Sequence, residues 1–425
     1  MTNELRDDQM TTTQTPVAEA PGAQTPDAAA GPGPARTAAE LLSRAQELAP
    51  VLRERAAEIE QHRRLPEDVV RMLRDTGVFR MAFDRDWGGL ELTSMEQTRV
   101  VEALAYGDAS AAWCGVIGAN SGIYSRFLDQ DAAREMFPGP DLIMAGLLQP
   151  SGRAERVPGG YRLSGRWPFG SGVAHSDWVT SGAFVYQDGE PYASPDGSNP
   201  HESRQFVVDR DQVGLVDNWH TTGLCGSGSC DYTITDVFVP EEHSYTFDTV
   251  HGRPSPLAQP DAFTRSMCGV PLGVARAALD HARGIALTRI DRMTGVAWSD
   301  SFRVQVTLAE CEADYNATRE GVYASMTRQW EVLAAGGTLD DLTPDERAAS
   351  PLAWVHSFRT SRSIVNRLYD LLQTWSINRS SPMDRWLRDT TTMCQHLIAQ
   401  DRILQSAGAY LVGGKPEFGI ALGIV

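Results

Sequence analysis

The spacing of apolar residues divides the chain into stretches of different periodicity. From Thr37 onward, apolar residues recur every three or four positions, which indicates amphipathic helices. The first apolar face consists of Leu41, Ala45, Leu48, Leu52, Ala56 and Ile59. Thr37 with Glu40 three residues later is typical of a helix N-cap. Further helices are predicted at 67–75, 94–106 and 110–127, so the chain is mostly helical up to about residue 150.

The period changes to two between about Gly152 and Val250. Short β-rich runs alternate there with Gly, Pro, Asp and Asn, which predicts a small antiparallel β-domain. Helical periodicity returns after Pro256 in segments long enough for a four-helix bundle. These segments are 265–291, 300–333, 345–376 and 384–411.

The resulting fold class is α+β, with an N-terminal helical domain, a middle antiparallel β-domain and a C-terminal four-helix bundle. We predict domain bounds of 37–150, 151–254 and 255–425. Residues 1–36 are rich in Thr, Pro, Ala, Gly and Gln and have almost no large apolar side chain. Such a segment buries too little surface to offset its ordering entropy, so we predict a disordered tail.

Charge and cysteine usage narrow the class of protein. The chain has 38 basic and 55 acidic residues, a formal net charge of −17, which argues against nucleic-acid or anionic-membrane binding. No apolar run is long enough to span a bilayer, and no secretory signal precedes the helices. The six cysteines are scattered without CxxC or zinc-site spacing. We therefore expect a cytoplasmic protein with free thiols.

Two Gly/Ser-rich turns beside aromatic rings carry the clearest chemical signal. They are Trp167–Gly172 and the segment from Trp219 to Pro240, and each borders a strand-like run. Glycines let backbone N–H groups approach a ligand closely, and serine hydroxyls provide donors beside flat apolar walls. A planar polar heterocycle such as a flavin needs that combination. A pair of ordinary hairpin loops explains the same residues equally well.

The sequences GRWPFGSG at 165–172 and GLCGSGS at 223–229 resemble the middle domain of flavin monooxygenases with the acyl-CoA dehydrogenase fold. The resemblance extends over most of the chain from about residue 37. It implies an oxygenase component of a two-component system, a homotetramer that binds reduced FMN, with FAD as the alternative, between the β-domain and the bundle. In such enzymes a C4a-hydroperoxyflavin transfers one oxygen to an aromatic or heteroatom-bearing small molecule.

A separate flavin reductase is expected as a partner. Gly226-x-Gly228 follows no βαβ unit and lacks the third glycine of a dinucleotide fingerprint. With no nicotinamide site visible, the chain would receive its reduced flavin from another protein.

His396 is the first candidate catalytic residue. Acyl-CoA dehydrogenases use a glutamate base, but no Glu lies between Arg388 and Gln405. The resemblance implies that a histidine here marks the oxygenase branch. Imidazole accepts a proton near neutral pH, or it orients the hydroperoxide. A structural histidine on a helix is the alternative.

Ser171 and Asn120 are the other candidate catalytic residues. In the matched family a serine of this turn lies near flavin N5 or the peroxide, where its hydroxyl stabilises developing charge. Alternatively, Ser171 satisfies its own turn. Asn120 falls where relatives place a polar residue against flavin or substrate, or it caps the helix that follows.

The remaining residues predicted to contact the flavin either lie in the two Gly/Ser turns or are arginines. Aromatic walls that exclude water are expected from Trp167, Phe169 and Trp219, with core packing as the alternative. Backbone and hydroxyl contacts are expected from Gly170, Ser171, Gly172, Thr222, Ser227 and Ser229. Phosphate contacts are expected from Arg289 and Arg388, although Arg388 alternatively pairs with Asp389 or a helix end.

Three other functions compete with the oxygenase. An acyl-CoA dehydrogenase with tightly held FAD is disfavoured by the missing glutamate and by the Phe169–Gly172 turn. An amino-sugar N-oxygenase of the same fold differs only in its substrate. A non-catalytic relative that merely binds flavin or a partner is the third alternative.

Overall fold

The computed structural model describes residues 35–194, 197 and 199–424. The tail predicted for residues 1–36 lies outside this part of the chain, except for its last two residues. Within the described residues, every helix is too short or too polar to traverse a lipid bilayer.

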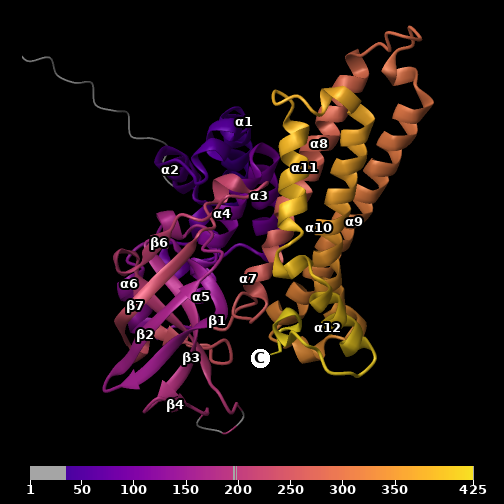
Figure 1. Cartoon of the computed structure of the whole chain (residues 1–425). Coiled ribbons are helices and arrows are strands. Elements are labelled where there is room, and N and C mark those ends of the chain that lie inside the picture. The colour runs from indigo at the N-terminus through magenta and orange to yellow at the C-terminus, as the bar shows by residue number, and fades with distance from the viewer. Residues whose placement is uncertain (1–34, 195–196, 198, 425) are drawn as a thin grey trace, which may run out of the picture. The chain divides into compact units, whose positions relative to one another are not determined.

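The N-terminal region is helical, as the three- to four-residue spacing predicts (Figure 1). Its helices are α1 (Ala38–His62), α2 (Glu67–Thr76), α3 (Ser94–Gly107), α4 (Ala109–Ala119), α5 (Ser121–Tyr124) and α6 (Gln130–Met136). Thr37 caps α1 by accepting a hydrogen bond from the Glu40 backbone N–H at 3.2 Å. The helix predicted at 110–127 is broken at Asn120 into α4 and α5.

Helix α4 is central to the packing. Every residue from Ala109 to Ala119 is buried except Ile117, which is partly buried. A helix that is apolar on all sides must be surrounded by protein. It contacts α3, the sheet strand β1 and helix α8 of the C-terminal region. This position allows its side chains to reach both turns of the sheet.

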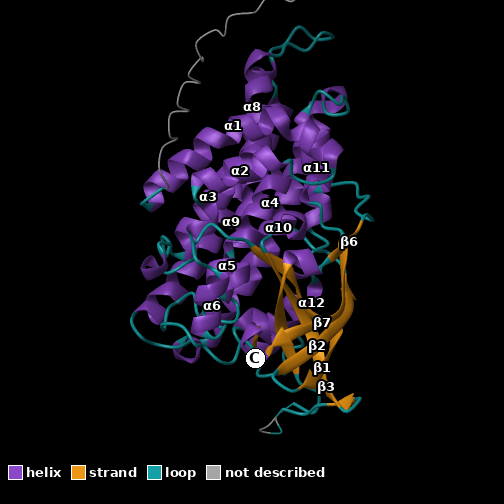
Figure 2. Cartoon of the chain, turned by 90° about the vertical axis from the view of Figure 1, so that its left-hand side faces the viewer, coloured by secondary structure: helices purple, strands orange, loops and turns teal. Residues whose placement is uncertain are grey.

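A curved sheet follows the first helices, with the helices grouped beside it (Figure 2). Its strands are β1 (Met144–Val157), β2 (Gly160–Trp167), β3 (Trp178–Gln187), β4 (Glu190–Pro191), β5 (Ser203–Asp209), β6 (Gly214–Val216), β7 (Asp231–Pro240) and β8 (Ser244–Tyr245). Their order is β6-β7-β2-β1-β3-β5-β8, and β4 pairs with β3.

The sheet corrects two details of the sequence prediction. Strands β1 and β3 pair in parallel, because the connection after β2 crosses to the other side of β1; the remaining pairs of the described strands are antiparallel. The sheet is therefore mixed rather than wholly antiparallel. It also starts at Met144, ahead of the expected boundary at 151, because the irregularity between Leu147 and Gly152 interrupts the period-two pattern.

The C-terminal region is again helical. Its helices are α7 (Ala262–Arg265), α8 (Gly269–Thr288), α9 (Phe302–Ala334), α10 (Pro344–Leu372), α11 (Pro382–Met393) and α12 (Asp401–Leu411). The long helix predicted at 384–411 is wrong in one respect. It is interrupted by a short 3-10 turn at Leu397–Ala399, which His396 precedes in an extended conformation.

Candidate active site where the sheet turns meet the helices

The second Gly/Ser turn is wedged among three helices. Its 3-10 segment, Cys225–Ser227, contacts α1 and α4. A Cβ on Gly226 would lie 2.2 Å from the Ile59 side chain, and a Cβ on Gly223 would lie 2.2 Å from the Arg388 carbonyl oxygen. The sequence predicted a close backbone approach to a ligand. These two glycines instead allow a close approach to α1 and α11.

A buried carboxylate anchors this turn. The Leu224 backbone N–H donates to Asp389 Oδ1 of α11 at 2.7 Å. Asp389 and Asp108 are both buried, at 3% and 4% exposure. Burial, together with the neighbouring charge of Asp108, raises the pKa of Asp389 to about 7. The sequence suggested Asp389 only as an ion-pair partner of Arg388, so its anchoring position was missed.

Four side chains form one hydrogen-bonded chain between the two turns. Trp113 Nε1 of α4 donates to Ser171 Oγ at 3.2 Å. Ser171 Oγ lies 2.6 Å from Ser229 Oγ, which lies 2.7 Å from Ser227 Oγ. Ser227 Oγ donates to the Leu224 carbonyl at 2.7 Å. The structure thus joins three predicted serines. It adds Trp113, whose place in an apolar helix had indicated only a core residue.

His396 lies against the same tryptophan. The rings of Trp113 and His396 meet edge to face, with centroids 5.1 Å apart and planes at 82°. Surrounding protein lowers the pKa of His396 to about 4, and the residue as a whole is partly exposed. The imidazole is therefore neutral at physiological pH. Trp113 links His396 to Ser171, so two of the three predicted catalytic residues lie in one cluster.

The third candidate, Asn120, lies two helical turns beyond Trp113 at the C-terminal end of α4. Its Nδ2 donates to the Phe263 carbonyl at 3.0 Å, and its side chain is 2% exposed. Among the described residues, Oδ1 has no hydrogen-bond partner. Asn120 does not cap α5 through its side chain, which excludes the alternative considered from the sequence. A buried acceptor without a partner is typical of a position that takes a donor from a ligand or a water.

The predicted aromatic walls divide into two kinds. Phe169 is 61% exposed at a backbone φ of +57°, and its ring meets Trp219 edge to face at 6.4 Å. Trp219 Nε1 donates to the Leu224 carbonyl at 3.1 Å, which fixes that ring to the second turn. Trp167 is a correction. It is fully buried, stacks on Tyr232 at 5.5 Å and donates to the Gly182 carbonyl, so it belongs to the sheet core.

The glycines of the first turn stand close to protein. A Cβ on Gly170 would lie 2.8 Å from the Tyr232 ring. Gly172 has a φ of +78°, a conformation that L-residues seldom adopt. These positions shape the turn so that Phe169 and Ser171 keep exposed surface.

The predicted phosphate contacts are not assembled here. Arg388 is engaged by Glu60 at 2.6 Å, Asp384 at 2.9 Å and the carbonyl of the exposed Thr222 at 2.6 Å. The guanidinium of Arg289 stacks over Trp298, 3.7 Å from its ring centre, at the end of α8. Within the described residues, neither guanidinium contacts the serine chain or His396.

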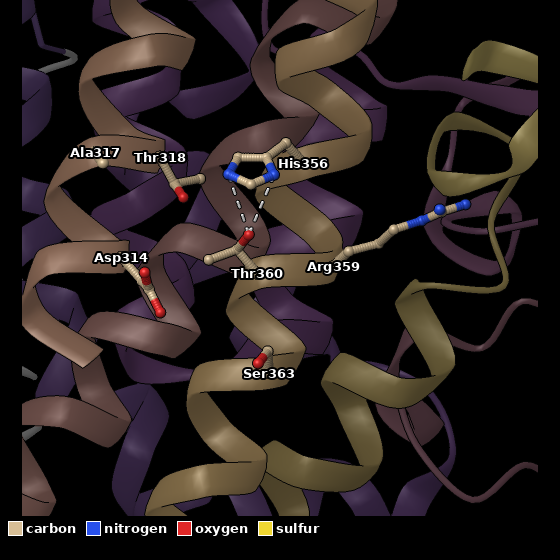
Figure 3. Close-up of a pocket in the computed structure, with 7 residues that line it drawn as sticks. All are labelled: Asp314, Ala317, Thr318, His356, Arg359, Thr360 and Ser363. Atoms are coloured by element: carbon tan, nitrogen blue, oxygen red, sulfur yellow. Dashed lines mark hydrogen bonds between the residues drawn. The ribbon is translucent and has the colours of Figure 1, made fainter. Parts of the chain in front are cut away.

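Two surface cavities lie away from these residues. One of about 260 Å³ lies between α9 and α10 and is lined by Asp314, Ala317, Thr318, His356, Arg359, Thr360 and Ser363. His356 and Thr360 hydrogen-bond there within one helix, while Arg359 points out of the cavity (Figure 3). The other, about 490 Å³, lies on β5 and β7 beside Trp178 and Phe238. Neither cavity is lined by a predicted site residue.

Comparison with protein-family models defines the class. Residues 39–136 match the acyl-CoA dehydrogenase N-terminal domain, and residues 266–401 match the acyl-CoA dehydrogenase C-terminal domain. The chain thus has the acyl-CoA dehydrogenase fold, with the α+β class predicted from the sequence.

Individual relatives identify the branch. Indole-3-acetate monooxygenase of Pseudomonas putida is 31% identical over 372 residues, covering 86% of this chain and 91% of that protein. The flavin-dependent monooxygenase oxygenase subunit HsaA of Mycobacterium tuberculosis is 25% identical over 404 residues, covering 91% and 98%. The solved structure of XiaF from Streptomyces sp. with FADH2 and glycerol has a TM-score of 0.81 at 25% identity, covering 90% of this chain and 97% of XiaF.

This chain belongs to the flavin-dependent monooxygenases of the acyl-CoA dehydrogenase fold. It is an oxygenase component that uses reduced flavin, as the resemblance of its two turns implied. The residues at the junction suit such a group. Phe169 offers an exposed ring there, and Ser171 is partly exposed; Asn120, two helical turns away on α4, has an acceptor without a partner among the described residues.

Proposed function

We propose that this chain oxygenates an aromatic or heteroatom-bearing small molecule at the junction of Ser171, Trp113 and His396. Reduced FMN is the flavin proposed, with FAD as the alternative, and a separate reductase supplies it. The observation that carries the proposal is the contiguous contact from His396 through Trp113 to Ser171. When bound, reduced flavin supplies the two electrons that activate dioxygen.

The residues of this chain divide the work by their chemistry. Phe169 and Trp219 present apolar ring surface that excludes water from the reacting atoms. Ser171 holds the polar edge of the flavin, at the open end of the serine chain. His396, neutral because burial lowers its pKa, accepts the Ile398 backbone N–H at Nδ1, so its other ring nitrogen carries a proton and donates a hydrogen bond that orients the substrate. Asn120 Oδ1 accepts a hydrogen bond from substrate or flavin.

The proposed homotetramer rests on apolar side chains at one end of the C-terminal helices. The most exposed of these are Leu287, Ile290, Met293, Phe302, Trp375 and Ile377, between 52% and 97% exposed. Clustered exposed apolar residues are typical of protein interfaces. Arg289 lies among these residues, so the phosphate that we propose it contacts would belong to a flavin bound by a second copy of the chain. Light scattering of the Met293→Asp and Phe302→Asp double variant tests this, because an unchanged mass would reject the interface.

The central test measures oxygen transfer and its coupling to flavin oxidation. The full chain is supplied with NADH, a flavin reductase, FMN, candidate aromatic substrates and ¹⁸O₂. We expect ¹⁸O in the product, and an unlabelled product would reject the proposal.

A histidine variant then tests the role of the cluster. We expect His396→Ala to lower product formation by at least tenfold while reduced flavin is still oxidised, with hydrogen peroxide released instead. His356→Ala is the matched control, since His356 is exposed on α10. Equal coupling in His396→Ala and wild type would contradict the assignment of His396.

A further inference from the structure

The cavity between α9 and α10 is lined almost entirely by polar side chains. Asp314 and Thr318 of α9 stand across from Thr360 and Ser363 of α10 (Figure 3). Among the lining residues that the structure describes, only Ala317 is apolar, and its single methyl group leaves the space open. The volume of about 260 Å³ equals that of about nine waters at ~30 Å³ each. It therefore suits a solute smaller than the ligands that fill pockets of about 300 to 1,000 Å³.

Thr318 brings a buried hydroxyl to the wall of this cavity. The residue is 4% exposed, and its Oγ1 has no hydrogen-bond partner among the described residues. A threonine inside a helix commonly donates to the carbonyl four residues earlier, as Thr98, Thr390 and Thr391 do at 2.7 to 2.8 Å. Thr318 makes no such bond to the Asp314 carbonyl. Because buried polar atoms are seldom left without a partner, we expect its partner to come from outside the chain.

The ion pairs around the cavity leave one negative charge over. Asp314 pairs with Arg367, which also lies 3.9 Å from Glu310. Arg359 points out of the cavity and pairs with Asp401 at 2.7 Å (Figure 3). Three carboxylates therefore share two guanidiniums in these contacts. Asp314 is the one of these carboxylates that lines the cavity, so a cation there meets a favourable charge and an anion an unfavourable one.

Oxygen acceptors face the same space from both helices. The Thr360 hydroxyl lies 3.3 Å from the His356 ring, and with two lone pairs its oxygen keeps a free acceptor position whichever group donates. Thr318 Oγ1 is free to accept, and the Asp314 carboxylate adds a charged acceptor. A primary ammonium group has three N–H donors and one positive charge. It therefore matches the acceptors of the cavity in number and in charge.

We propose that this cavity binds a small primary ammonium compound, a short-chain amino alcohol. The ammonium group lies among Asp314, Thr318 and Thr360, and it gives Thr318 Oγ1 a partner. The hydroxyl end of the ligand bonds Ser363, which lies about 4.5 Å further along α10 at ~1.5 Å per residue. The site is separate from the proposed oxygenation, because no described residue of its lining is assigned to that reaction.

Calorimetric titration of the full chain in about 0.15 M salt tests the charge preference. Three probes share a four-carbon chain with a hydroxyl at one end. At the other end 4-aminobutan-1-ol carries an ammonium, butane-1,4-diol a second hydroxyl, and 4-hydroxybutanoate a carboxylate. We expect the diol to bind at least about tenfold more weakly than the amino alcohol, and the carboxylate more weakly still. The proposal is wrong if the amino alcohol does not bind at up to about 10 mM, or if the diol binds equally well.

Variants locate the binding in the cavity. Ala317→Leu fills the space and removes no polar group, so it should weaken binding of the amino alcohol by at least about tenfold. Asp314→Asn removes the charge and should bring the affinities for the amino alcohol and the diol within about twofold of each other. Thr318→Val keeps the shape, removes the hydroxyl and should weaken the amino alcohol by about fivefold. Ala313→Leu and Glu320→Gln are the matched controls, because both residues are exposed on α9 but do not line the cavity.

The variants also separate a defined site from general attraction of cations. The whole chain has a formal net charge of −17, which attracts any cation weakly. If Ala317→Leu and Asp314→Asn, folded by circular dichroism, bind the amino alcohol as wild type does, the binding is general attraction and the cavity is not its site. Weaker binding in both variants, with wild-type affinity in both controls, supports the site. Ala317 and Asp314 are exposed, so these replacements leave the core intact.

Discussion

The buried carboxylate Asp389 makes a strong prediction about stability. Its side chain is 3% exposed, accepts a hydrogen bond from Leu224 and lies near Asp108. At about 1.36 kcal/mol for each pKa unit, the rise from 3.8 to about 7 corresponds to about 4 kcal/mol against the ionised form. Replacement by asparagine keeps an oxygen for Leu224 and removes the charge.

The sign of the effect follows from the two pKa values. In the unfolded chain Asp389 ionises near its ordinary pKa of 3.8, whereas in the folded protein the pKa is about 7. Between these values the unfolded state loses its proton first, so this residue lowers stability as pH rises and reaches its full penalty above pH 7. Because Asp389 and Asp108 titrate together, we take about half of the full value. Asp389→Asn should then stabilise by about 2 kcal/mol at pH 8 and by much less at pH 5.

Thermal unfolding at a series of pH values measures this directly. We expect the Tm of Asp389→Asn to exceed that of wild type by about 2 °C at pH 8, with the difference shrinking as pH falls. Asp384→Asn is the control, since Asp384 lies on the same helix but its side chain is 40% exposed. A lower Tm for Asp389→Asn at pH 8, or a difference that does not depend on pH, would refute the reasoning.

Three further predictions follow from close contacts and buried charges. Gly223→Ala should lower the free energy of unfolding by more than about 2 kcal/mol and weaken flavin binding, because its Cβ would overlap the Arg388 backbone. Gly284→Ala, on the open face of α8, should raise the free energy of unfolding by about 0.5 kcal/mol, and chemical unfolding compares the two variants. Asp261→Ala should lower the free energy of unfolding by about 3 to 5 kcal/mol, because it leaves the buried charge of Arg265 without its carboxylate. Asp401→Ala should lower it by less than about 1 kcal/mol, because the Asp401 side chain is 90% exposed; equal losses in the two variants would contradict this. Because the pKa of His396 is about 4, the imidazole stays neutral from pH 8 to about pH 5, so product formed per NADH should be flat between pH 6 and 8, and an inflection near 6.5 would count against it.

Much of the fold was predictable because local periodicity determines it. The apolar face of α1 and the Thr37 cap are confirmed, as are the helical ends and the central sheet. The break between α11 and α12 was missed because no Gly or Pro marks residues 384–406 and apolar spacing continues through it. The parallel pairing of β1 with β3 depends on which side of the sheet the chain returns to, and residue spacing carries no such information.

The candidate site was predictable only in part, for the same reason. Both turns were visible from their glycines, serines and aromatic residues, and His396 from the missing glutamate. Trp113 was not, because a tryptophan in an apolar helix has the signature of a core residue. Trp167, which had the right neighbours in sequence, points into the sheet core instead. Side-chain direction at a strand end is set by register with neighbouring strands, which the sequence does not display.

The anchoring of the second turn has a consequence for biosynthesis. Leu224 is held by Asp389, 165 positions later, and Arg388 reaches back to Glu60 across 328 positions. A nascent chain that has completed the sheet therefore still lacks the clamp that closes its second turn. Contacts between such distant parts form late, because the intervening loop must close first. The clamp on the second turn is consequently complete only after Asp389 has left the ribosome.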